Sequence, residues 1–291
     1  MDNLYGILGA WAEAGLLPQA FAYPFIVRAG LAGLILAPLL GGLSHLVVAR
    51  RLAFLSAALG HAALTGLTIG LFLGEPLSAP YFGIFGFCLL SGVAMVYVRR
   101  RTALPPDTLV GVFLSLSLGL GICLLVAVTR RFNVHQIEAI MFGSLLTLTD
   151  RDLLLLFLVA LGISVVLARI YNHLLLDSLS PALAQAHGVD TATLEYVFVV
   201  LLTAAIVVSL KVVGALLVES LVVVPAAAAR NLSRSARSYL VASVVLALIA
   251  TQGGIWASTQ WEVPTGGAVV LSLGALFFVT LAIGAWRRRP R

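Results

Sequence analysis

Two ionisable residues, His61 and Glu219, lie deep inside long apolar stretches of the sequence. His61 is near the middle of the run from Phe54 to Leu73, and Glu219 stands between the letters LLV and SLVVV. An imidazole nitrogen together with a carboxylate oxygen suits a divalent cation such as zinc or manganese. Ionisable groups inside a membrane are costly and are usually functional. We therefore predict that His61 and Glu219 are transient ligands of a cation that crosses the membrane.

Each of these two residues also has a structural interpretation. His61 could be a hydrogen-bonded histidine between packed helices, and Glu219 could be neutral and hydrogen-bonded. The residues one helical turn from His61 are Ala57 and Thr65, so this face of the helix is small and weakly polar. We predict that both residues line the pathway beside His61.

The composition requires a membrane around these residues. The 291-residue chain is 61% hydrophobic and 10% charged, with a mean hydropathy of +1.08, so it cannot be a soluble domain. The net charge of +6 comes mostly from arginines at the ends of apolar stretches, as in Arg99 to Arg101. This placement is typical of the positive-inside rule and does not indicate nucleic-acid binding.

The apolar stretches predict an all-α polytopic protein with eight to nine transmembrane helices. The predicted spans are 25–49, 54–73, 81–98, 109–128, 152–170, 194–229, 239–256 and 267–286. The stretch 194–229 is too long for one crossing, and we split it between Lys211 and Gly214, because a glycine break is tolerated where protein or water surrounds it. Gly66, Gly70 and Gly74 recur every four residues and predict close helix packing.

The connections complete the predicted organisation. We expect a short interfacial segment at 1–23, a transmembrane domain at 24–291, an amphipathic segment at 129–151 and a cytoplasmic loop at 171–193. Placing the arginine-rich ends in the cytoplasm puts the N-terminus outside and the C-terminus inside the cytoplasmic membrane.

The loop at 171–193 contains a short predicted helix. Ser180 is suited to the N-cap, Pro181 to the first helical position and Gly188 to the residue after the end. The helix is either a plain surface helix or a docking element for a cytosolic partner.

Enzyme motifs are missing from the sequence. The only lysine, Lys211, is followed by valine, so there is no Walker A motif, and neither HExxH nor GxSxG occurs. We predict a non-enzymatic membrane protein without a permanently bound cofactor. Active transport would take its energy from an ion gradient or from a partner chain.

Five stretches, in order along the chain, together resemble one family. They are YPFIVRAGLAG, VVARRLAFLSAALGHAALTGLTIG, IMFGSLLTLT, SPALAQAHGV and KVVGALLVESLVVVPAAAAR. This pattern is similar to the membrane permeases of ABC importers for zinc, manganese or iron, and it covers nearly the whole chain.

The resemblance implies a homodimeric permease with the type II importer fold of the vitamin B12 and iron–siderophore permeases. It implies that an extracytoplasmic metal-binding protein delivers the ion and that a cytosolic ABC ATPase supplies the energy. The residues implied for docking the ATPase are Ser180, Pro181, Ala182, Leu183 and Gly188. The pathway residues implied in the broken segment are Gly214, Ser220 and Pro225.

The sequence departs from this family at two positions. Ala57 stands where members often carry an aspartate, and Ala182 stands where the coupling segment often has an acidic residue. The first departure removes an expected metal ligand, which Glu219 could replace. A permease for a metal chelate or another small nutrient, a proton-coupled transporter that uses His61 and Glu219, and a structural scaffold stay as alternatives.

Overall fold

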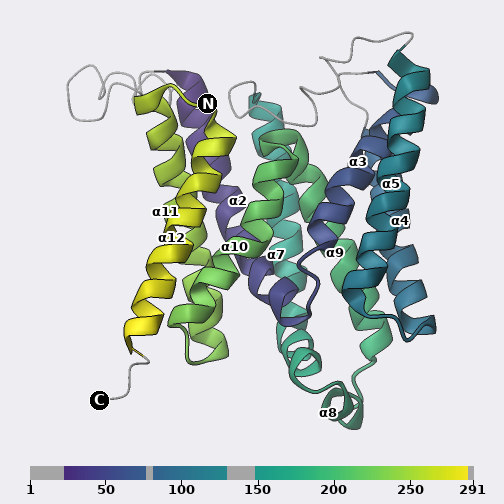
Figure 1. The fold of residues 1–291 in the computed structure, drawn as a ribbon, viewed down its shortest axis with the longest axis vertical. Coiled ribbons are helices and arrows are strands. Elements are labelled where there is room, and N and C mark those ends of the chain that lie inside the picture. Colours follow the sequence, from purple (N-terminus) through teal and green to yellow (C-terminus); the bar gives the residue numbers. More distant parts are fainter. Residues whose placement is uncertain (1–22, 77–80, 130–147, 288–291) are drawn as a thin grey trace.

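The computed structural model describes residues 23–76, 81–129 and 148–287. Within these ranges, nine helices are long and apolar enough to cross a membrane. They lie side by side along the long axis of the molecule, and the short helix α8 (Pro181–Ala186) projects from one end, which we name the α8 end (Figure 1). The predicted all-α polytopic architecture is confirmed.

The helices follow the predicted spans closely. Their bounds are α2 Pro24–Ala49, α3 Leu55–Phe72, α4 Tyr81–Arg101, α5 Pro106–Thr129, α7 Asp150–Leu179, α9 Thr191–Val213, α10 Ala215–Leu232, α11 Ala236–Trp261 and α12 Thr265–Arg287. The predicted segments at 1–23 and 129–151 lie largely outside the described residues.

The fifth span is longer than predicted. We expected it to end at 170, but α7 continues to Leu179 and thereby narrows the connection predicted at 171–193. A capping box between Thr149 and Asp152 starts α7, and the first stop signal after it is Ser180–Pro181. The polar residues at 171–179 form the last turns of a helix because nothing in that stretch breaks one.

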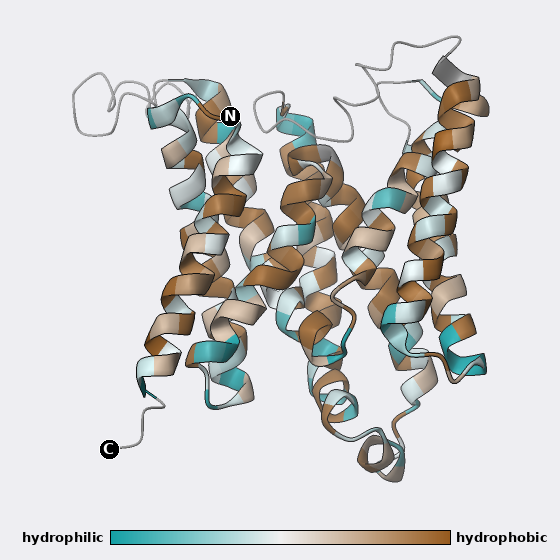
Figure 2. Ribbon diagram, in the orientation of Figure 1, coloured by the Kyte–Doolittle hydropathy of each residue, from teal (hydrophilic) through white to brown (hydrophobic). Residues whose placement is uncertain are grey.

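Burial separates the inner helices from the outer ones. The spans of α2 and α3 are mostly buried, whereas fewer than a third of the residues in the apolar windows of α4, α5, α7 and α12 are buried. Hydrophilic residues gather near the helix ends, and apolar residues fill the lengths between them (Figure 2). The outer helices therefore present the apolar surface that lipid requires.

Gly214 separates α9 from α10, as the sequence predicted. Its φ of 80° and ψ of 166° lie in a region that only glycine adopts readily. The Gly214 N–H donates to the Leu210 carbonyl at 2.8 Å, and the Gly214 carbonyl accepts from the Val218 N–H at 3.2 Å. The buried break therefore keeps its backbone hydrogen bonds.

The glycine face of α3 packs against α4 through two of its three predicted members. A Cβ added at Gly66 would lie 2.6 Å from the Gly83 carbonyl oxygen, and one at Gly70 would meet the Glu75 carboxylate and Gly83. Gly74 lies beyond the end of α3 with a φ of +93° and has open space around it. Close packing is therefore confirmed for Gly66 and Gly70, whereas Gly74 terminates the helix.

Replacing Gly66 with alanine is expected to lower the free energy of unfolding by about 1–3 kcal/mol, because the backbone of α4 must move to admit the methyl group. The thermal midpoint of the purified chain in detergent measures this. Gly86→Ala on α4 is the matched control, since a Cβ added at Gly86 meets no neighbouring side chain or helix within 4 Å. Equal midpoints for the two variants would contradict the packing argument.

Candidate functional site

His61 and Glu219 are brought together although 158 residues separate them in the sequence. His61 is on α3 and Glu219 on α10, and both are half-buried. A Cβ at Gly60 would lie 2.7 Å from Oε1 of Glu219, so the carboxylate occupies space that this glycine leaves free. Gly60 directly precedes His61, so the Glu219 carboxylate lies beside the turn of α3 that carries the histidine. The structure thus brings the two residues near each other on neighbouring helices, and their role as metal ligands stays a prediction.

The break at Gly214 positions this pair. It lets α10 begin against α3, where the Ala215 Cβ lies 3.8 Å from a Cβ position at Gly60. Glu219 follows one turn later on the same face of α10. Gly60 was not singled out in the sequence, although its place directly before His61 is the signal that could have identified it.

The pair offers one nitrogen and one carboxylate as ligands. Among the described residues, no group of three or more His, Cys, Asp or Glu side chains could hold a metal ion. A structural zinc site normally has four protein ligands, so this pair alone does not form one.

The neighbouring pathway residues are placed as follows. Ala57 is half-buried on α3, and Thr65 is buried, with its hydroxyl donating to the Ser117 carbonyl at 2.5 Å. The Ser220 hydroxyl donates to the Leu216 carbonyl of its own helix at 2.9 Å. Both hydroxyl protons are therefore used within the protein, and the roles of these residues in the pathway stay predictions.

Pro225 lies inside α10 and is buried. The N–H of the next residue, Ala226, donates to the hydroxyl of Ser44 on α2 at 3.1 Å. A proline disturbs the helical hydrogen bonds around it, and a hydroxyl from a neighbouring helix compensates for this. Ser44 was not predicted, because nothing in the local sequence links it to a proline 181 residues away.

The α8 helix has the predicted caps. The Ser180 hydroxyl accepts from the Leu183 N–H, and Pro181 occupies the first turn. Gly188 has a φ of +75°, and the N–H of Val189 donates to the Ala184 carbonyl at 3.0 Å. Ala184 is buried against the protein, whereas Leu183 is 50% exposed and therefore available to a partner.

The chain after α8 is held just as firmly. Asp190 is the N-cap of α9 and accepts hydrogen bonds from the Thr193 hydroxyl and from the backbone N–H groups of Thr193 and Ala192. These bonds hold the pKa of the Asp190 carboxyl below its usual range. The α8 helix is thus fixed at both of its ends.

Two groups of ion pairs flank α8 and were not predicted. Arg50 pairs with Asp177 at 2.7 Å, and Arg99 and Arg100 pair with Glu195 at 3.1 and 2.9 Å. The sequence patterns indicated only that the arginines mark the cytoplasmic ends of spans. The missed signal was the position of Asp177 and Glu195, which stand close to the two ends of the α8 connection.

Comparisons with known proteins bear on the family and the fold of the chain. The ABC 3 transport family matches residues 22–284. The high-affinity zinc uptake system membrane protein ZnuB of Haemophilus influenzae is 30% identical over 89% of this chain and 97% of its own length. The manganese import system permease protein ScaB of Streptococcus gordonii is 26% identical over 91% and 94%. The structure of PsaBC from Streptococcus pneumoniae in complex with a Fab has a TM-score of 0.76 at 24% identity, covering 89% of this chain and 91% of that chain, which confirms the predicted permease fold.

Proposed function

The chain belongs to the ABC 3 transport family, and on this premise we propose that it is the membrane permease subunit of an ABC importer for a divalent metal ion. The substrate is zinc, manganese or iron, and it crosses the cytoplasmic membrane through this subunit. Two relatives are named for zinc uptake and for manganese import, which supports this range of metals. The metal is cargo, and no permanently bound cofactor is part of the proposal.

One observation carries the proposal for the pathway. The Glu219 carboxylate lies against Gly60, the residue before His61, inside the membrane-spanning part of the protein and next to the break that starts α10. A nitrogen and a carboxylate oxygen are ligands that zinc, manganese and iron accept. In this proposal Glu219 supplies the carboxylate, because Ala57, one helical turn before His61, cannot.

The partners follow from the family and from the α8 end. A cytosolic ABC ATPase binds the exposed side of α8 and supplies the energy, because this chain has no Walker A motif. The functional unit is a homodimer, and an extracytoplasmic protein delivers the metal. The α8 end faces the cytoplasm, with the N-terminus outside and the C-terminus inside.

A permease for a metal chelate is the second candidate, because Ala57 removes a ligand and much of the surrounding helix surface is apolar. A proton-coupled transporter and a plain scaffold lose support, because the family consists of ABC transporters.

A measurement of metal uptake distinguishes the permease for a free metal ion from the permease for a chelate. The full chain with its co-purified ATPase, reconstituted in vesicles together with its binding protein, should take up free zinc or manganese when ATP is present. Uptake of a chelate alone would favour the second candidate.

Replacing Leu183 with glutamate is expected to weaken ATPase binding by about 2 kcal/mol or more, roughly thirtyfold, because the charge enters an apolar contact. Co-purification of the ATPase with the permease measures this. Leu104→Glu is the control, since Leu104 is 47% exposed in the turn between α4 and α5. Undiminished co-purification of the Leu183 variant would exclude α8 as the principal contact.

A further inference from the structure

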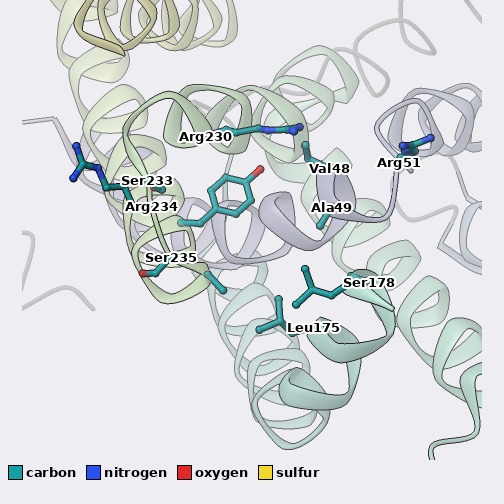
Figure 3. Close-up of a pocket in the computed structure, with 12 residues that line it drawn as sticks. Val48, Ala49, Arg51, Leu175, Ser178, Arg230, Ser233, Arg234 and Ser235 are labelled. Carbon is teal, nitrogen blue, oxygen red and sulfur yellow. The ribbon is translucent and has the colours of Figure 1, made fainter. Parts of the chain in front are cut away.

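A basic cavity of about 490 Å³ opens at the α8 end, between α2, α7 and the turn that joins α10 to α11. Arg51, Arg230 and Arg234 surround it. Arg230 extends toward Val48, Arg51 lies beyond Val48, and Arg234 stands at the opposite rim (Figure 3). The part of the chain that the structure describes contributes no carboxylate to the lining.

A neighbouring cavity of about 310 Å³ at the same end also contains several arginines, but carboxylates line it as well. There, Asp177 pairs with Arg50, and Glu195 pairs with Arg99 and Arg100, whereas Arg51 lines both cavities and pairs with neither carboxylate. In the described ranges, by contrast, no ion pair involves the side chains of Arg51, Arg230 or Arg234. The basic cavity therefore has a surplus of positive charge that its own walls do not balance.

Two hydroxyl groups in the basic cavity also lack partners. Ser233 Oγ and Tyr239 Oη are buried and form no hydrogen bond with the described residues. A buried hydroxyl without a partner is costly, so a ligand with acceptor oxygens would be favoured here. Guanidinium groups beside such hydroxyls are the chemistry that binds a phosphate.

Another cavity, which is mostly apolar and which we name the slot, lies farther from the α8 end along α2 and α7. It has a volume of about 340 Å³ and lies between α2, α7 and α11. Leu39, Leu167, Ala168 and Leu240 are among the residues that line it. Tyr239 lies between the two spaces, because it lines the basic cavity while its ring packs edge-on against His45 of the slot, with ring centroids 5.9 Å apart.

We propose that this seam between α2, α7 and α11 binds an anionic phospholipid. The phosphate lies near Arg51 and Arg230, the hydroxyls of Ser233 and Tyr239 donate to its oxygens, and one acyl chain occupies the slot. A free phosphate or an acidic protein side chain would use the basic cavity but would leave the slot empty. The proposal does not depend on which ion or molecule the protein transports.

The charge requirement is tested by native mass spectrometry of the full chain in detergent, with added phosphatidylglycerol or phosphatidylcholine of the same acyl chains. The variant Arg51→Gln/Arg230→Gln should bind phosphatidylglycerol about thirtyfold more weakly. The control Arg237→Gln/Arg287→Gln removes the same charge, lines neither cavity and should bind normally. Equal binding by the two double variants, or equal binding of both lipids by the unaltered chain, would overturn the proposal. If the first variant does not fold, Arg230→Gln alone serves in its place.

The slot is tested separately with Ala168→Phe, which fills it. This variant should lose phosphatidylglycerol but keep the affinity of the unaltered chain for glycerol phosphate. Unchanged lipid binding by this variant would mean that the cavity takes a soluble anion and would overturn the lipid assignment. Loss of the co-purified ATPase from Arg51→Gln/Arg230→Gln, with lipid retained, would assign the arginines to the protein partner and would overturn it as well.

Discussion

Replacing Glu219 with glutamine is expected to reduce metal uptake at least about tenfold to a hundredfold, while the permease still assembles with its ATPase. Changes in the groups that merely support a metal ligand already cost that much in affinity or activity. Glutamine keeps the shape of the side chain, so the space beside Gly60 stays filled. The charge and one strong ligand oxygen are lost, and uptake into reconstituted vesicles measures the effect.

The controls for this experiment come from the same chain. Glu262→Gln changes an exposed glutamate between α11 and α12 and should leave uptake unchanged. His61→Ala should cause a loss comparable to that of Glu219→Gln, and the double variant should add little if the two residues act as one site. Normal uptake by Glu219→Gln would refute the proposed site, although the family assignment would stand.

The fold was largely predictable because each of its signals is local in the sequence. Apolar stretches long enough to cross a bilayer predict the spans. Gly214 separates α9 from α10, and the ends of α8 are set by Ser180, Pro181 and Gly188. These signals are local because each residue acts on the backbone at its own position. The end of α7 was predicted too early because the polar residues after 170 resemble a loop in composition, although they contain no helix breaker.

The pairings across the bundle were less predictable because they depend on which helices become neighbours. Thr65 donates to Ser117 and Ala226 donates to Ser44, and neither contact has a local sequence signal. His61 and Glu219 could be proposed as partners only because charged groups inside a membrane are rare. The arginines had another sufficient explanation in the positive-inside rule, and their ion pairs were therefore missed.

Replacing Asp177 with asparagine is expected to destabilise the protein by about 3–5 kcal/mol, because it leaves the buried Arg50 guanidinium without its counter-charge. The two side chains are only 7% and 12% exposed, and their contact is 2.7 Å. Arg50 also donates to the Leu174 carbonyl and lies over the ring of Phe198, 5.2 Å from its centroid. Arg50 thereby joins α2, α7 and α9 at the α8 end. The same variant should therefore also lower the amount of metal transported for each ATP hydrolysed.

The comparison variants separate the buried charge from a general loss of surface charge. Arg100→Gln affects a more exposed arginine and leaves Arg99 paired with Glu195, so its cost should stay below about 1 kcal/mol. Arg50→Met combined with Asp177→Leu should recover most of the thermal stability, because replacing both charges removes the uncompensated one. If the ion pair serves only stability, this double variant will also couple ATP hydrolysis to uptake normally. If it is stable but uncoupled, the Arg50–Asp177 pair has a specific role in holding α8 against the ATPase. A thermal midpoint for Asp177→Asn equal to that of Arg100→Gln would contradict the prediction itself.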